Sequence, residues 1–264
     1  MKSLSQGKKQ VGHSGEAICN PFPQLANEGI HLRRGQLHLI AAAPGIGKSA
    51  LILYWAMVGE NRKKVDRVLY LSADSDPAVQ YKRAAQVASG YSNEFISEQL
   101  RSAPEWVDQV VTQGTAHMRF DFDSYPDADH ILNQVNAYLE IYGVYPDLII
   151  MDNAKNVRLG DDSRAGEFDE LEGTMEFLQQ VARETNSAVV TLHHVTGTYE
   201  DGDRAVPLSG IRGKVTKTPE TILTLFRGYG QTFVVPVKNR DGKADSAGGV
   251  VIALQSDLSR MHYA

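Results

Sequence analysis

Residues 41–50, AAAPGIGKSA, decide the fold of this chain. They follow the apolar run QLHLIAA, which has the length of a buried strand, and they precede SALILYWAMVGEN, which is typical of a helix. A glycine-rich loop that ends in Gly-Lys-Ser between a strand and a helix is suited to hold phosphate groups. A glycine turn in an ordinary α/β protein is the alternative, and the strand and helix on either side argue against it.

The loop residues have separate expected roles in binding a nucleotide. Backbone N–H groups of residues 45–49 would surround the β-phosphate, helped by the positive end of the following helix. Lys48 would reach the β- and γ-phosphates, and the Ser49 hydroxyl would bind Mg²⁺. The phosphate-loop pattern has glycine where this chain has Ala42. The predicted nucleotide-binding residues are Ala43, Pro44, Gly45, Ile46, Gly47, Lys48, Ser49 and Ala50.

Composition limits the classes of protein to which the chain can belong. Its 264 residues, 42% hydrophobic and 22% charged, can bury one sizeable core, which favours a single large domain. The one cysteine, Cys19, excludes a disulfide framework and a cysteine zinc site. No secretion signal or membrane-length apolar run is visible, so we expect a cytoplasmic protein with no membrane partner. With a net charge of −5, any binding of nucleic acid has to depend on local basic loops.

The order of elements predicts an α/β fold with a mostly parallel central sheet and helices on both faces. Strand-like and helix-like runs alternate through the first two-thirds of the chain. The late runs ETILTLFR, QTFVVPVK and GVVIALQ would add antiparallel strands. We expect residues 1–15 to form a flexible arm, with a subunit-linking arm as the alternative, and residues 16–264 to form one domain. The segment NPFP, before the first strand, is expected to be a loop.

Two acidic residues follow predicted parallel strands at the edge where such sheets bind ligands. Asp152 closes DLIIMD and is the candidate for holding Mg²⁺ opposite Ser49, with capping of the next segment as the alternative. Asp74 follows RVLYLSA and is the candidate general base that orients the attacking water. Capping is again the alternative for Asp74, and Asp76 is just as suited to cap a helix.

Two further pairs of residues are candidates for roles in catalysis. His193 and His194 end the run SAVVTLHHV and would point to opposite faces of the sheet. A polar group there could sense the γ-phosphate, and we favour His194 because it lies nearer the following loop. Lys238 and Arg240 lie two residues apart in VKNRDG, and on sequence alone the pair is typical of a solvated hairpin tip.

Together, these residues resemble the RecA-like hexameric helicases over about residues 27–255. The resemblance is to the motor domain of DnaB-like replicative helicases and to the RepA-type hexamers. The loop of that family reads Ala-Arg-Pro-x-x-Gly-Lys-Ser/Thr, so Ala42 is the family's usual choice, and Ala43 replaces its arginine. The resemblance implies a RecA-like P-loop NTPase fold with ATP and Mg²⁺ as ligands.

The resemblance extends to residues outside the loop. The family's second strand ends Ser-x-Glu, with an arginine nine residues later, and this chain has Ser72, Asp74 and Arg83 at those positions. Lys238 and Arg240 match a Lys-x-Arg on the family's late strand. That match implies an arginine finger and a companion lysine that act on the ATP of a neighbouring subunit. The active site would then be complete only in a homo-oligomer, which we expect to be a hexameric ring.

The family also implies that single-stranded DNA passes through the ring, with a primase or a loader as further replication partners. Two loops follow the nucleotide-sensing strands and would line the channel, residues 154–166 and residues 196–217. Their candidate DNA-binding residues are Lys155, Arg158, Arg164, Arg204, Arg212, Lys214 and Lys217. Solvated loop charge is the alternative for each of them.

The sequence leaves three functions open. The first is an ATP-driven helicase or translocase on single-stranded DNA. The second is a RecA- or RadA-like recombination ATPase that forms filaments. The third is an ATP-switched binding or regulatory module that hydrolyses weakly, an option left open because Asp74 is one methylene shorter than the family's glutamate.

Overall fold

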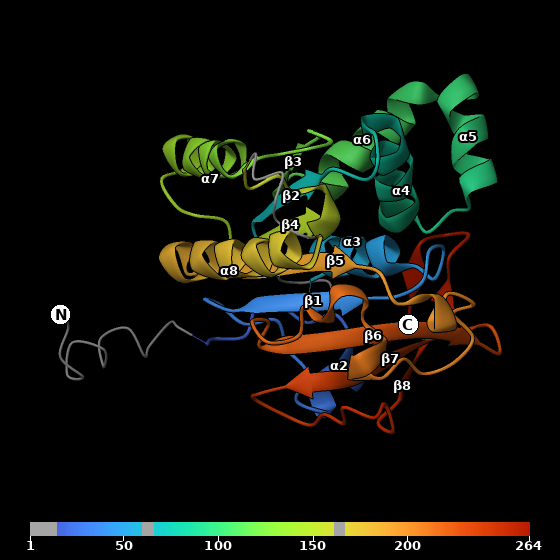
Figure 1. Cartoon of the computed structure of the whole chain (residues 1–264). Coiled ribbons are helices and arrows are strands. Elements are labelled where there is room, and N and C mark those ends of the chain that lie inside the picture. Colours follow the sequence, from blue (N-terminus) through green and yellow to red (C-terminus); the bar gives the residue numbers. More distant parts are fainter. Residues whose placement is uncertain (1–14, 60–65, 161–166) are drawn as a thin grey trace.

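One nine-stranded sheet organises the part of the chain that the structure describes (Figure 1). The computed structural model describes residues 15–59, 66–160 and 167–264. The order across the sheet is β3-β2-β4-β5-β1-β6-β7-β8-β9. The strands are β1 (Leu37–Ala41), β2 (Val68–Ser72), β3 (Met118–Asp121), β4 (Leu148–Asp152), β5 (Ala188–His193), β6 (Thr221–Gly228), β7 (Gln231–Asn239), β8 (Ile252–Asp257) and β9 (His262–Tyr263).

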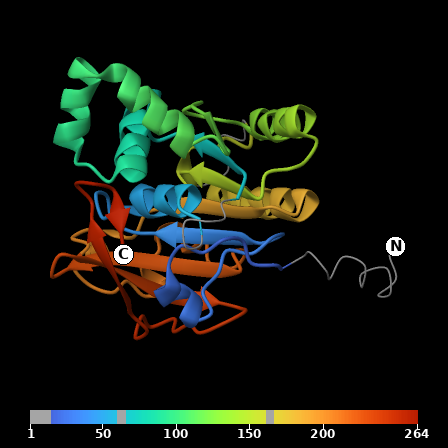
Figure 2. The same ribbon diagram turned by 180° about the vertical axis from the view of Figure 1, so that it is seen from behind.

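Helices cover both faces of this sheet. In Figure 1 the helix α8 lies in front of the strands, whereas α3 and α2 lie in front in Figure 2, which is the view from behind. The α-helices are α2 (Pro23–Asn27), α3 (Lys48–Met57), α4 (Pro77–Ser89), α5 (Asn93–Ser102), α6 (Pro104–Gly114), α7 (Ala128–Tyr142) and α8 (Glu167–Thr185). Short 3₁₀ helices are η1 (Ala154–Asn156), η2 (Gly197–Tyr199), η3 (Leu208–Gly210) and η4 (Arg212–Lys214).

The sheet is parallel from β3 through β6 and antiparallel from β6 onward. Every residue of β1, β2, β4 and β5 is buried, as expected for strands covered on both faces by helices. The predicted α/β fold, with a mostly parallel sheet and late antiparallel strands, is confirmed. The carboxyl ends of β1, β2, β4 and β5 therefore lie along one edge.

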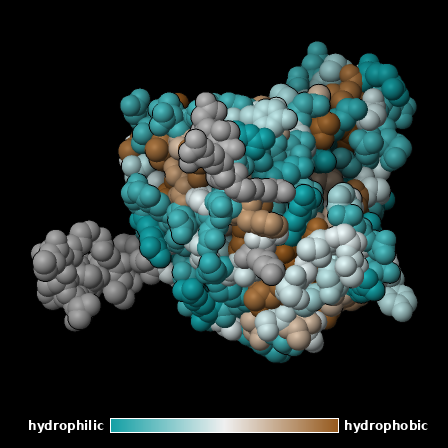
Figure 3. All heavy atoms as spheres, in the orientation of Figure 1, coloured by the Kyte–Doolittle hydropathy of each residue, from teal (hydrophilic) through white to brown (hydrophobic). Residues whose placement is uncertain are grey.

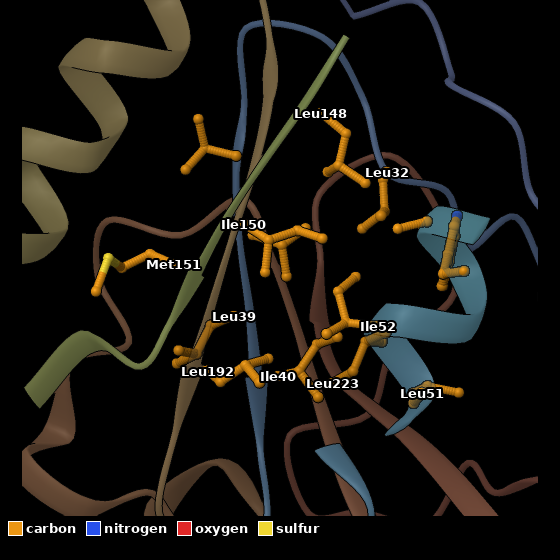
Figure 4. Close-up of a cluster of buried hydrophobic side chains, with 14 of the residues drawn as sticks. Leu32, Leu39, Ile40, Leu51, Ile52, Leu148, Ile150, Met151, Leu192 and Leu223 are labelled. Atoms are coloured by element: carbon orange, nitrogen blue, oxygen red, sulfur yellow. The ribbon is translucent and has the colours of Figure 1, made fainter. Parts of the chain in front are cut away.

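Branched apolar side chains fill the space between the strands and α3. Figure 4 shows Ile40, Ile150, Leu192 and Leu223, from four neighbouring strands, together with Ile52 of α3. All five are buried, with at most 1% of their surface exposed. Because close-packed protein interiors deform very little, this core fixes the strand ends relative to one another.

The helices α4, α5 and α6 form a smaller cluster beside the sheet. Their own core contains Ala85, Ile96 and Val107. Aromatic side chains surround it, with Phe95 stacked on Tyr91 at 4.3 Å between ring centroids. Figure 3 shows hydrophobic side chains among hydrophilic ones over these helices, and further hydrophobic side chains elsewhere on the same face.

The region before β1 differs from the prediction. NPFP is expected to be a loop, but Pro23 opens α2, because the fixed φ of proline suits the first turn of a helix. The strand β9 was not predicted, since two residues carry no periodic pattern. The first fourteen residues of the predicted arm lie outside the described residues, and the division at residue 15 stays a prediction. Within the described ranges, no helix has both the length and the hydropathy required to span a membrane.

Asp147 lies at the amino end of β4, at the edge of the sheet opposite Asp152, and links the segments that contain Arg34 and Arg67. Its carboxylate accepts hydrogen bonds from Arg34 at 2.7 Å and from Arg67 at 2.9 and 3.0 Å. Burial alone would raise the pKa of Asp147, but the hydrogen bonds from the two arginines outweigh it and lower the pKa to about 2. Asp147 is therefore a structural residue.

We expect Asp147→Asn to lower the free energy of unfolding by about 2 kcal/mol at pH 7. A carboxylate with a lowered pKa stabilises the fold above its unfolded pKa of about 3.9, and this contribution is lost as the pH falls through about 2. In urea unfolding, the difference in the free energy of unfolding between Asp147→Asn and the native chain should therefore be roughly half as large at pH 3 as at pH 7. Asp129→Asn, at an exposed position in the first turn of α7, is the control and should change stability by less than about 0.5 kcal/mol. An equal loss at both pH values would contradict the prediction.

Candidate active site

The loop between β1 and α3 has a conformation that requires glycine. Gly45 and Gly47 have φ values of 78° and 108°, in the left-handed region. A Cβ at Gly47 would lie 3.2 Å from Tyr263 Oη and 3.3 Å from the methyl groups of Leu258. The helix α3 begins directly afterwards at Lys48, so its first N–H groups and the positive end of its dipole face the space beside the loop.

The Lys48 side chain lies back along its own loop. Its ammonium donates hydrogen bonds to the carbonyl oxygens of Ala42 at 2.9 Å and Ala43 at 3.2 Å. Burial lowers the pKa of Lys48 to about 8, against the opposing effect of Asp152 and Asp74. A phosphate oxygen would offer this ammonium a stronger, charged acceptor than either carbonyl group.

A cleft of about 360 Å³ opens beside the loop. Its lining includes Pro44, Gly45, Gly47, Lys48, Ser49, Ala50, Asp74, Asp152 and His194. Ala43 and Ile46, also predicted, are buried and do not line it. A larger hollow of about 640 Å³, beside α3 and α6, contains none of the predicted residues. We place the site in the smaller cleft, because four separate predicted features converge there.

Asp152 ends β4 with its side chain almost wholly buried, at 1% exposed. Its carboxylate accepts hydrogen bonds from the Ser49 hydroxyl and from Tyr70 Oη, the latter at 2.9 Å. Burial raises the pKa of Asp152, and these hydrogen bonds oppose the rise. A hydroxyl and a carboxylate side by side are the hard oxygen donors that Mg²⁺ prefers when phosphate oxygens supply the remaining ligands. The residues present therefore fit this ion.

Asp74 is fixed to the end of β4 through its backbone. The N–H groups of Ala73 and Asp74 both donate to the carbonyl oxygen of Asp152, at 2.8 and 3.0 Å. Asp76, and not Asp74, caps α4, since its side chain accepts from the Val79 N–H at 2.9 Å. The carboxylate of Asp74 is therefore not used as a helix cap and lines the cleft.

The two histidines after β5 point to different surroundings. His193 is buried, and its Nε2 donates to the Arg212 carbonyl oxygen at 2.9 Å. His194 lines the cleft, and its Nε2 is buried without a hydrogen-bond partner among the described residues. Burial, together with the charges of Lys48 and Lys155, lowers the pKa of His194 to about 4, so the ring is neutral at pH 7. This neutral ring faces the cleft, where we predicted a γ-phosphate sensor.

Lys238 and Arg240 do not lie in this cleft. The end of β7 pairs with the start of β6, as Thr221 opposite Asn239, and Thr221 lies beside His38 at the amino end of β1. The phosphate loop leaves the carboxyl end of β1. The two residues therefore lie at the opposite edge of the sheet from Lys48.

Each member of this pair is held by its own surroundings. Lys238 Nζ donates to the carbonyl oxygens of Thr216 and Lys217, at 2.7 and 2.8 Å. The Arg240 guanidinium is 58% exposed and pairs with the Glu220 carboxylate at 3.0 Å. Lys238 thus binds the long loop that follows β5, while Arg240 stays largely open to solvent.

Comparison with known families agrees with this geometry. The family model for the AAA domain matches residues 20–198, a span that contains the loop, Asp74, Asp152 and His194. The chain belongs to the AAA domain family. Membership implies a P-loop ATPase that binds nucleotide. Lys238 and Arg240 lie beyond the matched span.

Two phage proteins are similar to this AAA domain along most of its length. The Gene 65 protein of Mycobacterium phage L5 is 41% identical over 244 residues, covering 90% of this chain and 88% of that protein. The Gene 65 protein of Mycobacterium phage D29 is 40% identical over 228 residues, covering 82% and 94%. Neither name states an activity.

Two solved structures share the fold of this AAA domain. One, described as an ATPase domain, superposes with a TM-score of 0.79 at 16% identity, over 98% of this chain and 95% of that one. A DnaB-like replicative helicase, described with its interactions with primase, has the same TM-score and identity, over 98% of this chain and 64% of that one. The predicted resemblance to a DnaB-like ATPase domain is confirmed at the level of the fold.

The two basic loops of the chain lie near one another at the start of α8, where both η1 and η4 pack. The first loop carries Lys155 and Arg158, and the Arg158 guanidinium lies over the Tyr125 ring at 5.2 Å. The Arg212 N–H of the second loop donates to the His194 carbonyl oxygen at 3.2 Å. Lys214 belongs to η4, and Arg164 lies outside the described residues.

Two other basic residues of the second loop are engaged within the chain. Lys217 pairs with Glu172 of α8 at 2.9 Å. Arg204 lies over the Tyr199 ring, with its guanidinium 5.4 Å from the centroid. DNA binding by any of these loop residues stays a prediction.

Several residues that line the cleft or contact its residues were not predicted. Leu258 and Met261, from the turn between β8 and β9, line its wall. Tyr263 Oη approaches the Gly47 carbonyl oxygen at 3.3 Å. Tyr70 could have been predicted from the sequence, because a tyrosine inside the apolar run VLYLS needs a hydrogen-bond partner once it is buried. The turn between β8 and β9 has no sequence pattern that predicts its contact with the cleft.

Proposed function

We propose that this chain is an ATP-driven helicase or translocase that acts on single-stranded DNA as a ring of identical subunits, six by the family resemblance. ATP would be hydrolysed between neighbouring copies. The observation that carries the proposal is the placement of Lys238 and Arg240 at the edge of the sheet opposite the cleft. A head-to-tail ring would bring that edge of one copy against the cleft of the next.

Within one copy, the cleft residues would bind and orient the nucleotide. Lys48 would exchange its loop carbonyl acceptors for β- and γ-phosphate oxygens. Ser49 and Asp152 would hold Mg²⁺, which supplies charge neutralisation between the β- and γ-phosphates when bound. Asp74 would accept a proton from the attacking water or orient it, and His194 would donate a hydrogen bond toward the γ-phosphate.

The neighbouring copy would supply the remaining positive charge. Phosphoryl transfer concentrates negative charge on the transferred group, and an arginine brought in from outside stabilises it. Arg240 is exposed enough to reach a partner once its ion pair with Glu220 opens. Lys238 binds the loop after β5, so it would link this contact to the predicted DNA-binding loop.

The DNA would contact the two basic loops near the start of α8. Both follow strands whose ends line the cleft, which supports a connection between the state of the nucleotide and the position of the loops. Backbone phosphates would be the main target, because the loops carry lysine and arginine side chains and present few aromatic side chains for stacking. A primase or loader is a further proposed partner, by analogy with the DnaB-like helicases.

A weakly hydrolysing, ATP-switched module is the second candidate. The observation that favours it is Asp74, whose carboxylate is shorter than the family's glutamate and whose backbone is fixed to Asp152. A recombination ATPase that forms filaments would use the same cleft. The rate of ATP turnover distinguishes the weakly hydrolysing switch from the helicase and from the recombination ATPase. The mass of the assembly distinguishes a closed ring from an open filament.

The decisive test measures ATP turnover with and without single-stranded DNA, together with the solution mass with and without nucleotide. We expect turnover to rise at least about tenfold with single-stranded DNA, and a closed oligomer of defined mass to form. Blunt duplex DNA of equal length is the control and should stimulate less. A monomer throughout, with no stimulation by DNA, would rule out the helicase proposal. Slow turnover in a stable DNA complex would favour the switch.

A further inference from the structure

Tyr70 places a hydroxyl group deep inside the central sheet. It lies in β2, in the run VLYLS, with none of its surface exposed. Its ring stacks on Phe120 with 5.4 Å between centroids, so the aromatic part packs as a phenylalanine would. Burying the additional hydroxyl is unfavourable unless it is hydrogen-bonded. The packing of the core therefore does not explain why this residue is tyrosine.

The hydroxyl of Tyr70 forms a hydrogen bond with the Asp152 carboxylate. Tyr70 Oη donates to Asp152 Oδ2 at 2.9 Å, and both side chains are at most 1% exposed. Gln80 also hydrogen-bonds the Tyr70 hydroxyl. The Gln80 Nε2 group donates to Ser72 Oγ at 3.0 Å, and its second proton can be donated to the Tyr70 oxygen, which leaves the Tyr70 proton for the carboxylate. The bond is long-range in sequence, spanning 82 residues between neighbouring strands.

This bond defines how the carboxylate faces the cleft. The Asp152 carboxylate can turn about its Cβ–Cγ bond, and a hydrogen-bond donor on Oδ2 fixes that rotation. The Ser49 hydroxyl, the other predicted ligand of Mg²⁺, also bonds to Asp152. Tyr70 does not line the cleft, so it acts from behind the carboxylate.

We infer that Tyr70 is a positioning residue that orients the Asp152 carboxylate for Mg²⁺ in the nucleotide complex. The inference rests on the nucleotide site of the proposed function, but it requires neither DNA nor a ring. Hydrogen-bond partners behind a metal ligand fix its orientation, and their loss typically weakens metal affinity or activity by about 10- to 100-fold. Removing the hydroxyl also leaves a buried carboxylate oxygen without its donor.

The test is Tyr70→Phe, which removes one oxygen and keeps the ring. Binding of a fluorescent, non-hydrolysable ATP analogue is titrated with Mg²⁺, and also measured in EDTA. We expect the Mg²⁺ concentration for half-maximal effect to rise by about 10- to 100-fold, with the affinity in EDTA within about twofold of the native chain. Tyr138→Phe, at a buried tyrosine of α7 away from the cleft, is the matched control and should leave both unchanged.

A double-mutant cycle with Asp152→Asn separates positioning from packing. If Tyr70 acts through Asp152, Tyr70→Phe should have no further effect on the Mg²⁺ midpoint in the Asp152→Asn chain. That double variant lacks the buried charge together with its donor, so it remains measurable if Tyr70→Phe alone folds poorly. An unchanged Mg²⁺ midpoint in Tyr70→Phe, or an effect of equal size in the Asp152→Asn chain, would overturn the inference. Loss of nucleotide binding by the native chain would instead overturn the proposed function.

Discussion

Arg240→Ala is expected to reduce ATP turnover by about 10³-fold or more, while nucleotide affinity stays within about twofold of the native chain. The reason is the position of Arg240 at the sheet edge opposite its own cleft, so that in the proposed ring it would contact the nucleotide of a neighbouring copy. Removing it takes away positive charge in the transition state and leaves the phosphate loop untouched. Turnover and equilibrium binding, measured on the same preparation, test the two halves of the prediction.

Mixing two inactive variants gives a stricter version of this test. A Lys48→Ala chain keeps Arg240, and an Arg240→Ala chain keeps an intact cleft. Wherever the two meet in the right order, one complete site forms, so the mixture should recover part of the lost turnover. Arg101→Ala, at an exposed position at the end of α5, is the control and should remain active alone. No recovery, together with a loss of binding as large as in Lys48→Ala, would show that Arg240 acts within its own chain.

Lys48→Ala is expected to weaken ATP binding by roughly 10- to 150-fold, corresponding to about 1.5–3 kcal/mol for hydrogen bonds to a charged group. The Lys48 ammonium lies at the base of the cleft, held by the Ala42 and Ala43 carbonyl oxygens. Without it, the phosphates lose their one buried cationic partner from the loop. Titration with a fluorescent ATP analogue in the presence of Mg²⁺ measures the loss.

The control for this prediction is another lysine outside the cleft. Lys243 is exposed and pairs with Glu28 at 2.8 Å, so Lys243→Ala removes the same charge from the chain. Lys243→Ala should leave the affinity for ATP within about twofold of the native chain. Salt largely screens the interaction between an exposed charge outside the cleft and a nucleotide bound in it. A similar loss in both variants would mean that net charge, and not the loop, governs binding.

The centre of the fold and the polar half of the cleft could be predicted from the sequence. The apolar runs of β1, β2, β4 and β5 are continuous because both of their faces are covered, and such runs are easy to recognise. Parallel strands place their carboxyl ends along one edge, so Asp74 and Asp152 had to lie near the loop. Local pattern and topology agree here.

The rest of the cleft could not be predicted in this way. Leu258 and Met261 reach it through long-range packing of a turn that has no regular pattern of its own. Tyr263 approaches Gly47 across 216 residues of sequence, a contact that only the assembled tertiary structure specifies. The separation of Arg240 from the cleft depended on the pairing of β6 with both β1 and β7, which the hydrophobic pattern alone does not define.

The hydrogen bonds from Ala73 and Asp74 to the Asp152 carbonyl oxygen have a consequence for how this site can evolve. They join the ends of β2 and β4, so they fix the spacing between the main chains of Asp74 and Asp152, and side-chain length then sets how far each carboxylate reaches. Lengthening Asp74 to glutamate would advance its carboxylate by about 1.5 Å toward the nucleotide without moving Asp152. A single codon change could thus alter the reach of the predicted base while the metal ligand keeps its place.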